Sequence, residues 1–446
     1  MVAAAIALYF LVRSGGKDLI AAASGPAEAG KHAKAGSLGQ VFFAVALVIV
    51  FARLVGAAFE RWLNQSAVMG EITAGLVLGP SALGAISHDT YARLFPPIAS
   101  QLGLLANLGV VLFMFLVGLG LDLSVLRRSS HAVLAISHAS IVAPFVLGAT
   151  LALGLYPLYG YAGSGFTVFS LFLGVSMSVT AFPVLARILI DRGMENTPLG
   201  ATALACAAVD DVTAWCLLAL VSAVAVAQVG DAAWTLGLLV AYAAFMWVVV
   251  RPILRSLADR EDRSQAPVSL MVLSIIFGAL LLSAAATELI GVHALFGAFA
   301  LGALIPHDGR LAMQLRAKLE DAVTVLLLPI FFAFTGMRTQ IGLISGAQDW
   351  LLTGAIVLVA TAGKFGGSFV AARFVGLGWR EASALGILMN TRGLMELVVL
   401  NVGLDMGVLS PTLFTMLVLM AVLTTFATTP ILGLITGRGG GVASGR

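Results

Sequence analysis

Charged residues are scarce in this chain: Asp, Glu, Lys and Arg make up only 11% of its 446 residues, against 60% hydrophobic residues. Soluble globular domains carry roughly 25% charged residues, so this composition excludes an ordinary soluble enzyme, a disordered chain and a coiled coil. The 25 basic and 22 acidic residues leave a net charge of only +3, which argues against a nucleic-acid-binding protein. With a mean hydropathy of +1.03, the chain is predicted to be an all-α polytopic membrane protein.

Cysteine is almost absent as well. The two cysteines, Cys206 and Cys216, lie in one apolar stretch. Their spacing corresponds to about 15 Å of helical rise, which is too far for a disulfide bond. The sequence contains neither a cysteine–histidine metal motif nor a Gly-rich string ending in Lys-Ser or Lys-Thr that would bind ATP. We therefore expect no cofactor and no nucleotide as the energy source.

Apolar runs, in contrast, are abundant, and many are long enough to cross a bilayer, whose hydrocarbon core takes about 20 helical residues. They predict thirteen transmembrane helices, near residues 40–63, 66–86, 98–121, 130–153, 166–190, 197–224, 231–250, 267–286, 290–306, 322–338, 350–374, 380–403 and 411–434. These helices form one predicted membrane domain over 40–436, followed by a tail at 437–446.

Lysine and arginine are distributed unevenly among the connections, and cytoplasmic loops are the ones that collect them. If the first span starts outside, the outer loops contain only Arg93 and Arg338. The inner side then contains sixteen basic residues: Arg61, Arg127, Arg128, Arg187, Arg192, Arg251, Arg255, Arg260, Arg263, Arg310, Arg316, Lys318, Arg373, Arg380, Arg438 and Arg446. This asymmetry predicts a cytoplasmic C-terminus, and we expect the bacterial inner (plasma) membrane as the location.

Residues 1–39 do not follow this regular pattern. Residues 1–12 are apolar but too short to cross a bilayer comfortably, and a Gly- and Ala-rich stretch with several basic residues follows them. A signal-like segment, a truncated extra helix and a flexible arm on the membrane all fit, and the sequence leaves the three open.

Two pairs of short strings recur at similar distances along the chain. Thr73–Gly79 resembles Phe296–Gly302 at an offset of 223 residues, and Phe113–Gly118 resembles Phe331–Gly336 at an offset of 218. Since one extra span separates the two copies, the second copy is upside down in the membrane.

The recurrence predicts two inverted six-helix repeats, at 40–224 and 267–434, joined by a linking helix at 231–250. Inverted repeats are the architecture of many secondary transporters.

Ionisable residues in the middle of membrane spans are costly to insert and are therefore candidates for function. Asp210 and Asp211 lie in the middle of the sixth predicted span, and Lys364 lies near the middle of the eleventh. A further polar group in the middle of the twelfth span consists of Asn390, Arg392 and Glu396. These spans share one depth in the membrane.

The adjacent aspartates are the sharpest feature of the sequence. Neighbours on a helix differ by about 100°, so both carboxylates can border one cavity without pointing in the same direction. Such a pair titrates as a coupled unit and can hold protons or a monovalent cation in competition. The alternative is that both aspartates only neutralise Lys364 and Arg392. Lys364 itself either pairs with one aspartate when no cation is bound or serves as a fixed structural charge.

Two spans carry helix-breaking sequences at corresponding places in the two repeats. Pro183 interrupts the fifth span, where Ser178 and Thr180 can bond the freed backbone groups, and Asn390-Thr-Arg-Gly393 is the counterpart in the twelfth. Discontinuous helices of this kind mark transporter binding sites, because unwound carbonyls ligate cations and a residue such as Arg392 offsets the half-helix dipoles. The alternative is an ordinary proline kink plus a glycine packing notch.

Asn390, Glu396 and Glu71 are accessory candidates. Glu71 is near the inner end of the second span, where it either lines the access path or forms an interfacial salt bridge.

These motifs together resemble the monovalent cation:proton antiporter superfamily, specifically its second family, which includes bacterial sodium/proton antiporters, Kef systems and CHX exchangers. The resemblance covers about residues 40–434. It rests on GEITAGLVLGPS, SVTAFPVLARIL, AAVDDVTAW, the Lys364 span and MNTRGLMELVVLN, the last of which is most similar to the CHX side of the family.

The resemblance implies specific roles. Asp211 would be the main cation- and proton-binding carboxylate, with Thr180, Ser178 and nearby carbonyls completing the coordination, and Asp210 would pair with Lys364. It also implies an elevator-like movement of spans four to six and eleven to thirteen against a dimerising domain, in a homodimer. Two aspartates resemble the electrogenic type of the family, whereas the Asn-Thr-Arg-Gly string leaves ion choice and stoichiometry open.

We therefore predict a secondary antiporter that exchanges Na⁺ or K⁺ for protons. A gated cation channel or efflux system is the first alternative, although no filter-like string supports it. An intramembrane aspartyl protease is the second. Its two aspartates should come from different helices, and here they are neighbours on one.

Overall fold

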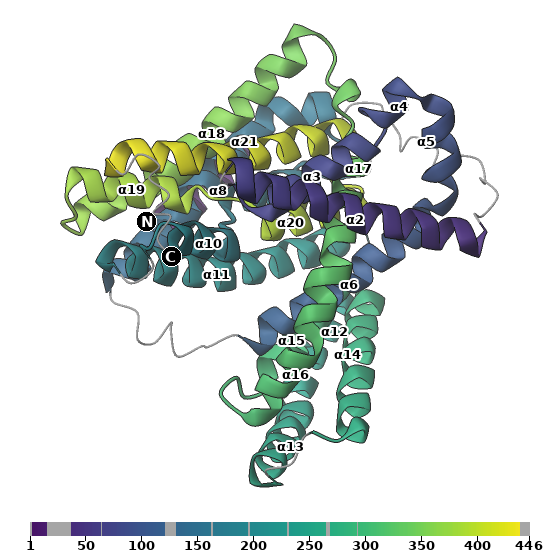
Figure 1. Ribbon diagram of the computed structural model, residues 1–446. Helices are drawn as coiled ribbons and strands as arrows, with labels where there is room; N and C mark the ends of the chain where they lie inside the picture. Colours follow the sequence, from purple (N-terminus) through teal and green to yellow (C-terminus); the bar gives the residue numbers. More distant parts are fainter. Residues whose placement is uncertain are drawn as a thin grey trace, which may run out of the picture.

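The computed structural model describes residues 2–15, 37–63, 65–120, 131–161, 164–194, 197–229, 232–264, 268–291 and 293–437. Over these ranges the regular structure is entirely helical, with no β-strand (Figure 1). The predicted all-α fold class is confirmed. Most of the N-terminal segment and the tail after residue 437 lie outside the described residues.

All thirteen predicted spans contain helix, but their lengths differ from the prediction. In the described part of the chain, ten helices are long and apolar enough to cross a membrane, or eleven if a bent pair counts as one span. The fifth predicted span is two short helices, and the ninth is a helix of only 11 residues. Thirteen full-length spans are therefore not reached, because the two halves of the broken fifth span and the ninth helix are each too short to cross a membrane alone.

One set of helices, here called the core group, packs around the two broken spans. The two 29-residue helices α8 and α18 cross in its centre, and their partners pack on either side. Its members are α8 (His131–Tyr159), α9 (Phe166–Ser178), α10 (Phe182–Asp191), α11 (Pro198–Val229), α18 (Gly346–Phe374), α19 (Trp379–Met389), α20 (Leu394–Asp405) and α21 (Pro411–Thr436).

A second set, the scaffold group, packs mostly within itself. Its members are α2 (Leu38–Leu63), α3 (Ala67–Leu78), α6 (Ala99–Leu119), α14 (Leu270–Ile290), α15 (Ala294–Leu304) and α17 (Leu328–Arg338). Helix α17 is preceded by α16 (Arg310–Asp321) and by the π-helix η3 (Ala322–Leu327). The wide turn fits Pro329, which cannot donate a backbone hydrogen bond to the preceding turn.

Glycine allows the scaffold helices to approach closely in two pairs. In α3 and α17, a Cβ at Gly75 would lie 2.1 Å from the Ala333 carbonyl oxygen. In α6 and α15, a Cβ at Gly118 would lie 2.3 Å from the Phe299 carbonyl oxygen. Any larger residue at either glycine would force the two backbones apart.

The remaining elements belong to neither group. They are α1 (Val2–Gly15), α4 (Leu83–Ile86), α5 (His88–Leu94), η1 (Pro96–Ile98), α12 (Ala232–Phe245), η2 (Met246–Val250), α13 (Arg251–Ser264) and η4 (Ile341–Leu343). The predicted linking helix is present, and it continues through η2 into α13. Helix α1, at the start of the chain, packs against α8 and α9 of the core group.

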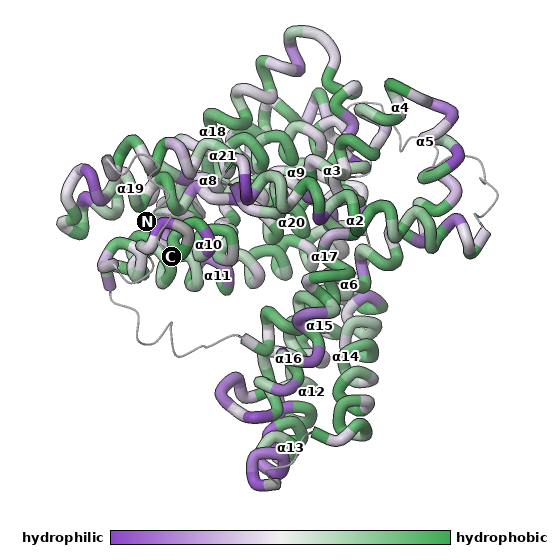
Figure 2. The backbone as a smooth tube through the Cα atoms, in the orientation of Figure 1, coloured by the Kyte–Doolittle hydropathy of each residue, from purple (hydrophilic) through white to green (hydrophobic). Residues whose placement is uncertain are grey.

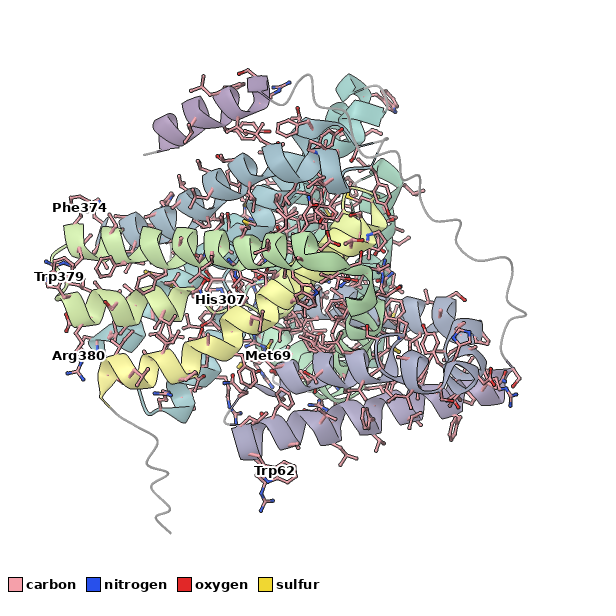
Figure 3. The ribbon with its side chains drawn as sticks, turned by 90° about the horizontal axis from the view of Figure 1, so that it is seen from above. Trp62, Met69, His307, Phe374, Trp379 and Arg380 are labelled. Carbon is pink, nitrogen blue, oxygen red and sulfur yellow. The ribbon has the colours of Figure 1, made fainter. Side chains whose placement is uncertain are left out.

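The outer surface of the helices is apolar, as a bilayer requires. Hydrophilic residues gather at α13, α16 and the helix ends, whereas the lengths of the helices are hydrophobic (Figure 2). Trp62 and Trp379 are 78% and 69% exposed and lie at the periphery, as interface anchors do (Figure 3). Trp215 is the exception among the tryptophans, being only 3% exposed.

Candidate functional site

Two interrupted helices meet inside the core group. Helix α9 ends at Ser178 and α10 begins at Phe182, while α19 ends at Met389 and α20 begins at Leu394, with a 43° bend between the latter pair. The two unwound segments touch, because the Ala181 N–H donates to the Thr391 carbonyl at 3.0 Å. The predicted breaks in both spans are thus confirmed.

Gly393 is required where these segments cross. A Cβ at this position would lie 2.8 Å from Val184 Cγ2 and 3.2 Å from the Ala181 Cβ. Gly393 is therefore needed because the two broken spans approach too closely to leave room for a side chain.

Asp210 is a fully buried carboxylate surrounded by donors. Ser137 and Ser140 of α8 donate to its two oxygens at 2.6 and 2.5 Å, and Thr180 donates at 2.7 Å. Lys364 Nζ of α18 lies 3.0 Å from Oδ2. Both carboxylate oxygens of Asp210 therefore have hydrogen-bond partners, and a lysine ammonium group lies beside them.

Lys364 is fully buried as well, and its ammonium group also donates to the Ser178 carbonyl at the end of α9. It reaches this depth because two glycines bring α18 against α8. A Cβ at Gly363 would lie 2.6 Å from Pro144 Cα, and a Cβ at Gly367 would lie 2.6 Å from the Ala139 carbonyl oxygen. Lys364 thus connects Asp210 to the break between α9 and α10.

Arg392 is the basic residue of the other broken span, where it lies in the unwound segment between α19 and α20. Its guanidinium donates to the carbonyls of Ser176 and Met177 at 3.1 and 2.9 Å, and to Glu396 Oε2 at 3.0 Å. These carbonyls belong to the last turn of α9, where the helix dipole places partial negative charge. Arg392 therefore compensates the end of α9, and Glu396 compensates Arg392.

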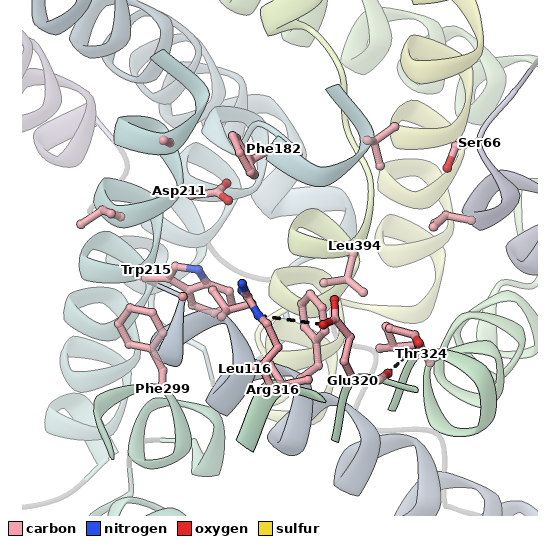
Figure 4. Close-up of a pocket in the computed structure, with 18 of the residues that line it drawn as sticks. Ser66, Leu116, Phe182, Asp211, Trp215, Phe299, Arg316, Glu320, Thr324 and Leu394 are labelled. Atoms are coloured by element: carbon pink, nitrogen blue, oxygen red, sulfur yellow. Dashed lines mark hydrogen bonds and ion pairs between the residues drawn. The ribbon is translucent and has the colours of Figure 1, made fainter. Parts of the chain in front are cut away.

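Asp211 takes part in none of these ion pairs. No described residue forms an ion pair with it, and its buried Oδ1 has no hydrogen-bond partner among them. The backbone of Phe182, at the start of α10, lies against the carboxylate (Figure 4). An unpaired carboxylate at this depth is unfavourable as a bare anion, so it favours binding a proton or a cation.

Asp211 borders a cavity of about 680 Å³ between the core and scaffold groups. Core residues of α10, α11 and α20 line one wall, and scaffold residues of α6, α15 and α17 line the other. Arg316 and Glu320 of α16 lie across the cavity from Asp211 (Figure 4). Within the described residues, these three side chains are the ionisable groups on the cavity wall.

The remaining predicted residues are arranged differently. The hydroxyl of Ser178 donates to the carbonyls of Ile141 and Gly174, and Thr180 bonds Asp210, so neither hydroxyl is directed at Asp211. Asn390 is buried beside the second break, with its Oδ1 unpartnered among the described residues. Glu71 is buried and ion-paired with Arg53 at 3.1 Å, which matches the salt-bridge alternative.

Ser137, Ser140 and Arg53 were not singled out from the sequence. The two serines precede Pro144 on one face of an apolar helix, a signal that is weak because serine is common in membrane helices. Arg53 also donates to the Thr324 carbonyl, so it connects α2 to the π-helix η3 beside the cavity.

Comparison with known proteins shows clear relatives. The family described as "Sodium/hydrogen exchanger, transmembrane" matches residues 47–435. The Na⁺/H⁺ antiporter NhaS4 of Synechocystis sp. is 44% identical over 394 residues, covering 87% of this chain and 95% of that protein.

Two longer eukaryotic proteins are also similar. Cation/H⁺ antiporter 20 of Arabidopsis thaliana is 42% identical over 402 residues, and K⁺/H⁺ antiporter 1 of Saccharomyces cerevisiae is 34% identical over 410 residues. The match covers 86% and 88% of this chain but only 47% and 46% of those proteins, so the chain spans about half their length.

The fold is similar to that of a solved structure, the sodium proton antiporter MjNhaP1 from Methanocaldococcus jannaschii. The two superpose with a TM-score of 0.61 at 15% sequence identity, covering 90% of this chain and 97% of the other.

Proposed function

The chain belongs to the sodium/hydrogen exchanger family and is a cation/proton antiporter, and on that premise we propose that it exchanges Na⁺ or K⁺ for protons by alternating access. Asp211 is the carboxylate that carries either cargo. The observation behind this assignment is that Asp210 has a full set of partners, whereas Asp211 lines the cavity without an ion-pair partner among the described residues.

Charge compensation explains why the two cargoes are coupled. A bare Asp211 carboxylate is costly to move through a low-dielectric barrier, and binding of either a proton or a cation removes that cost. The loaded carrier therefore reorients, and the empty one is held back. Since both cargoes occupy the same carboxylate, one must leave before the other binds, which enforces exchange.

We propose that the core group moves against the scaffold group in an elevator-like step. The aspartates and both broken helices all belong to the core group, and the cavity lies at its boundary with the scaffold. Most helix packing is within each group, so a relative movement retains most of the packed core.

Inverted repeats give this movement its two end states. In the predicted repeats, α3 corresponds to α15 and α6 corresponds to α17. Exchanging each helix for its counterpart therefore converts the contact between α3 and α17 into the contact between α15 and α6. Both contacts are made, and both depend on glycine. The pairing supports the repeats predicted from the offsets of 223 and 218 residues.

We propose an electrogenic exchange, with more protons than cations moved in each cycle, because Asp210 and Lys364 add a second titratable unit beside Asp211. Na⁺ and K⁺ both stay candidates, since relatives are named for Na⁺/H⁺ and K⁺/H⁺ exchange. A homodimer in the bacterial inner membrane with a cytoplasmic C-terminus completes the proposal.

Proton movement in proteoliposomes tests the proposal. Na⁺ and K⁺ gradients are imposed separately on purified protein, with the membrane potential either clamped or free, and internal pH is followed. We expect one cation to drive proton movement that depends on the potential. Movement that ignores the potential would exclude the electrogenic assignment, and the absence of coupled movement with both cations would contradict the antiporter and favour a channel.

A further inference from the structure

Two helices run from the cavity to the opposite end of the boundary between the groups. Leu328 and Phe332 of α17 line the cavity, and α17 ends at Arg338, about 9 Å beyond Phe332 along its axis. Leu394 of α20 also lines the cavity, and α20 ends at Asp405, about 16 Å farther on. Both helices therefore have one end at the cavity and the other end away from it.

A polar network joins the two helices at the end away from the cavity. Arg338 of the scaffold donates to Asp405 of the core at 2.5 Å and to Asn401 Oδ1 at 3.0 Å. The Asn401 amide donates in turn to Thr335 Oγ1 of α17 at 2.9 Å. We call these four residues, Arg338, Asp405, Asn401 and Thr335, the α17–α20 latch.

The latch is shielded from water to different degrees along its length. The Arg338 and Asp405 side chains are 26% and 33% exposed, Asn401 is 7% exposed and Thr335 is fully buried. The ion pair is thus at the rim and the amide–hydroxyl bond lies inside. A neighbouring aromatic side chain reinforces the rim, because the ring of Phe334 lies 5.6 Å from the guanidinium.

Within the described part of the chain, the ion pair between the groups at the cavity end is more exposed to solvent. Arg187 of α10 lies 3.8 Å from Glu60 of α2, with both side chains largely exposed, and Gln65 donates one hydrogen bond to the Phe426 carbonyl. The less exposed polar connection is thus at the end away from the cavity. A carrier that exposes its site on one side must be closed on the other.

We propose that the α17–α20 latch is the closure that holds the core against the scaffold while Asp211 faces the cavity, and that it opens when the site turns to the other side. This inference rests on the proposed alternating-access function. Arg338 and Asp405 act as positioning residues, because they contact neither the cavity nor Asp211. By the predicted orientation, Arg338 places the latch on the outer side.

Breaking the latch should raise the population of the opposite conformation without touching the ion site. A charge-assisted hydrogen bond between partly buried groups favours the closed state enough that its loss raises the minor population about tenfold. Thr335 can report this directly, since it is fully buried here and should become accessible when the latch opens.

The experiment measures labelling of Thr335→Cys by a membrane-impermeant thiol reagent in vesicles, in a Cys206→Ala, Cys216→Ala background. We expect Arg338→Ala to speed labelling about tenfold, and the charge swap Arg338→Asp with Asp405→Arg to slow it again. Arg187→Ala, which removes the ion pair at the cavity end, is the matched control and should not speed labelling. Equal rates with and without Arg338→Ala, or equal acceleration by Arg187→Ala, would overturn the proposal.

A second measurement uses function. Arg338→Cys and Asp405→Cys are joined by a short bis-methanethiosulfonate, and cation-driven proton movement is followed before and after reduction. We expect the bridge to stop exchange and reduction to restore it, whereas exchange through an intact bridge would overturn the latch. Wild-type vesicles are measured in parallel to distinguish the antiporter proposal from the latch proposal. If the wild type shows no exchange, the proposed function fails, and the labelling experiment still tests the latch.

Discussion

Asp210 and Asp211 are neighbours on α11, yet one is fully satisfied and the other is not. Asp210 is bonded to three hydroxyls and to Lys364, whereas Asp211 Oδ1 is buried without a partner among the described residues. The difference arises because successive residues on a helix point about 100° apart. One side chain therefore faces α8 and α18, and the other faces the cavity.

Asp211→Asn should abolish exchange and leave the protein folded. The amide can neither release a proton nor neutralise a cation, and it removes an unpaired buried carboxylate, so stability should not fall. Cation-driven proton movement in proteoliposomes and thermal unfolding in detergent measure the two effects. Exchange at the wild-type rate would contradict the assignment of Asp211 as the carrier.

The Asp210–Lys364 pair should show strong coupling in a double-mutant cycle. Asp210→Asn or Lys364→Met alone leaves a buried charge without its counter-ion, which costs about 3–5 kcal/mol of stability. The double variant removes both charges and should be more stable than either single variant. Thermal unfolding of the four proteins checks this, and additive losses would show that the pair is not coupled.

Two glycines on one helix give a matched test of packing between α18 and α8. Gly363→Ala would place a Cβ 2.6 Å from Pro144 Cα and should cost about 1–3 kcal/mol, with loss of exchange as Lys364 shifts. Gly366→Ala meets nothing within 4 Å and should be neutral or stabilising by up to about 1 kcal/mol. Equal effects on unfolding temperature would contradict the packing argument.

Arg316 and Glu320 should shift cation affinity in opposite directions. Both line the cavity that leads to Asp211, so Glu320→Gln removes an attractive charge and Arg316→Gln a repulsive one. We expect KM for the cation to rise about two- to fivefold in the first variant and to fall similarly in the second, with both effects smaller at high salt. Initial exchange rates at varied cation concentration provide the measurement. Parallel shifts would mean that neither charge acts on the cation.

Local patterns in the sequence predicted the membrane class, the buried ionisable residues and the two broken helices. These features depend on composition within one span, since apolar length decides insertion and proline or glycine interrupts a helix. The number of full-length spans was less accurate, because hydropathy identifies 166–190 and 290–306 as membrane segments but does not show how long each helix is.

The partners of each charge were decided by tertiary structure. Ser137 and Lys364 are 73 and 154 residues away from Asp210, and Arg338 reaches Asp405 across 67 residues. Packing of α8 and α18 around α11 determines which aspartate is neutralised and which stays open to the cavity. A sequence shows that charges lie at one depth, but the direction of each side chain depends on how the helices are rotated against one another, and that rotation is determined by contacts between distant segments.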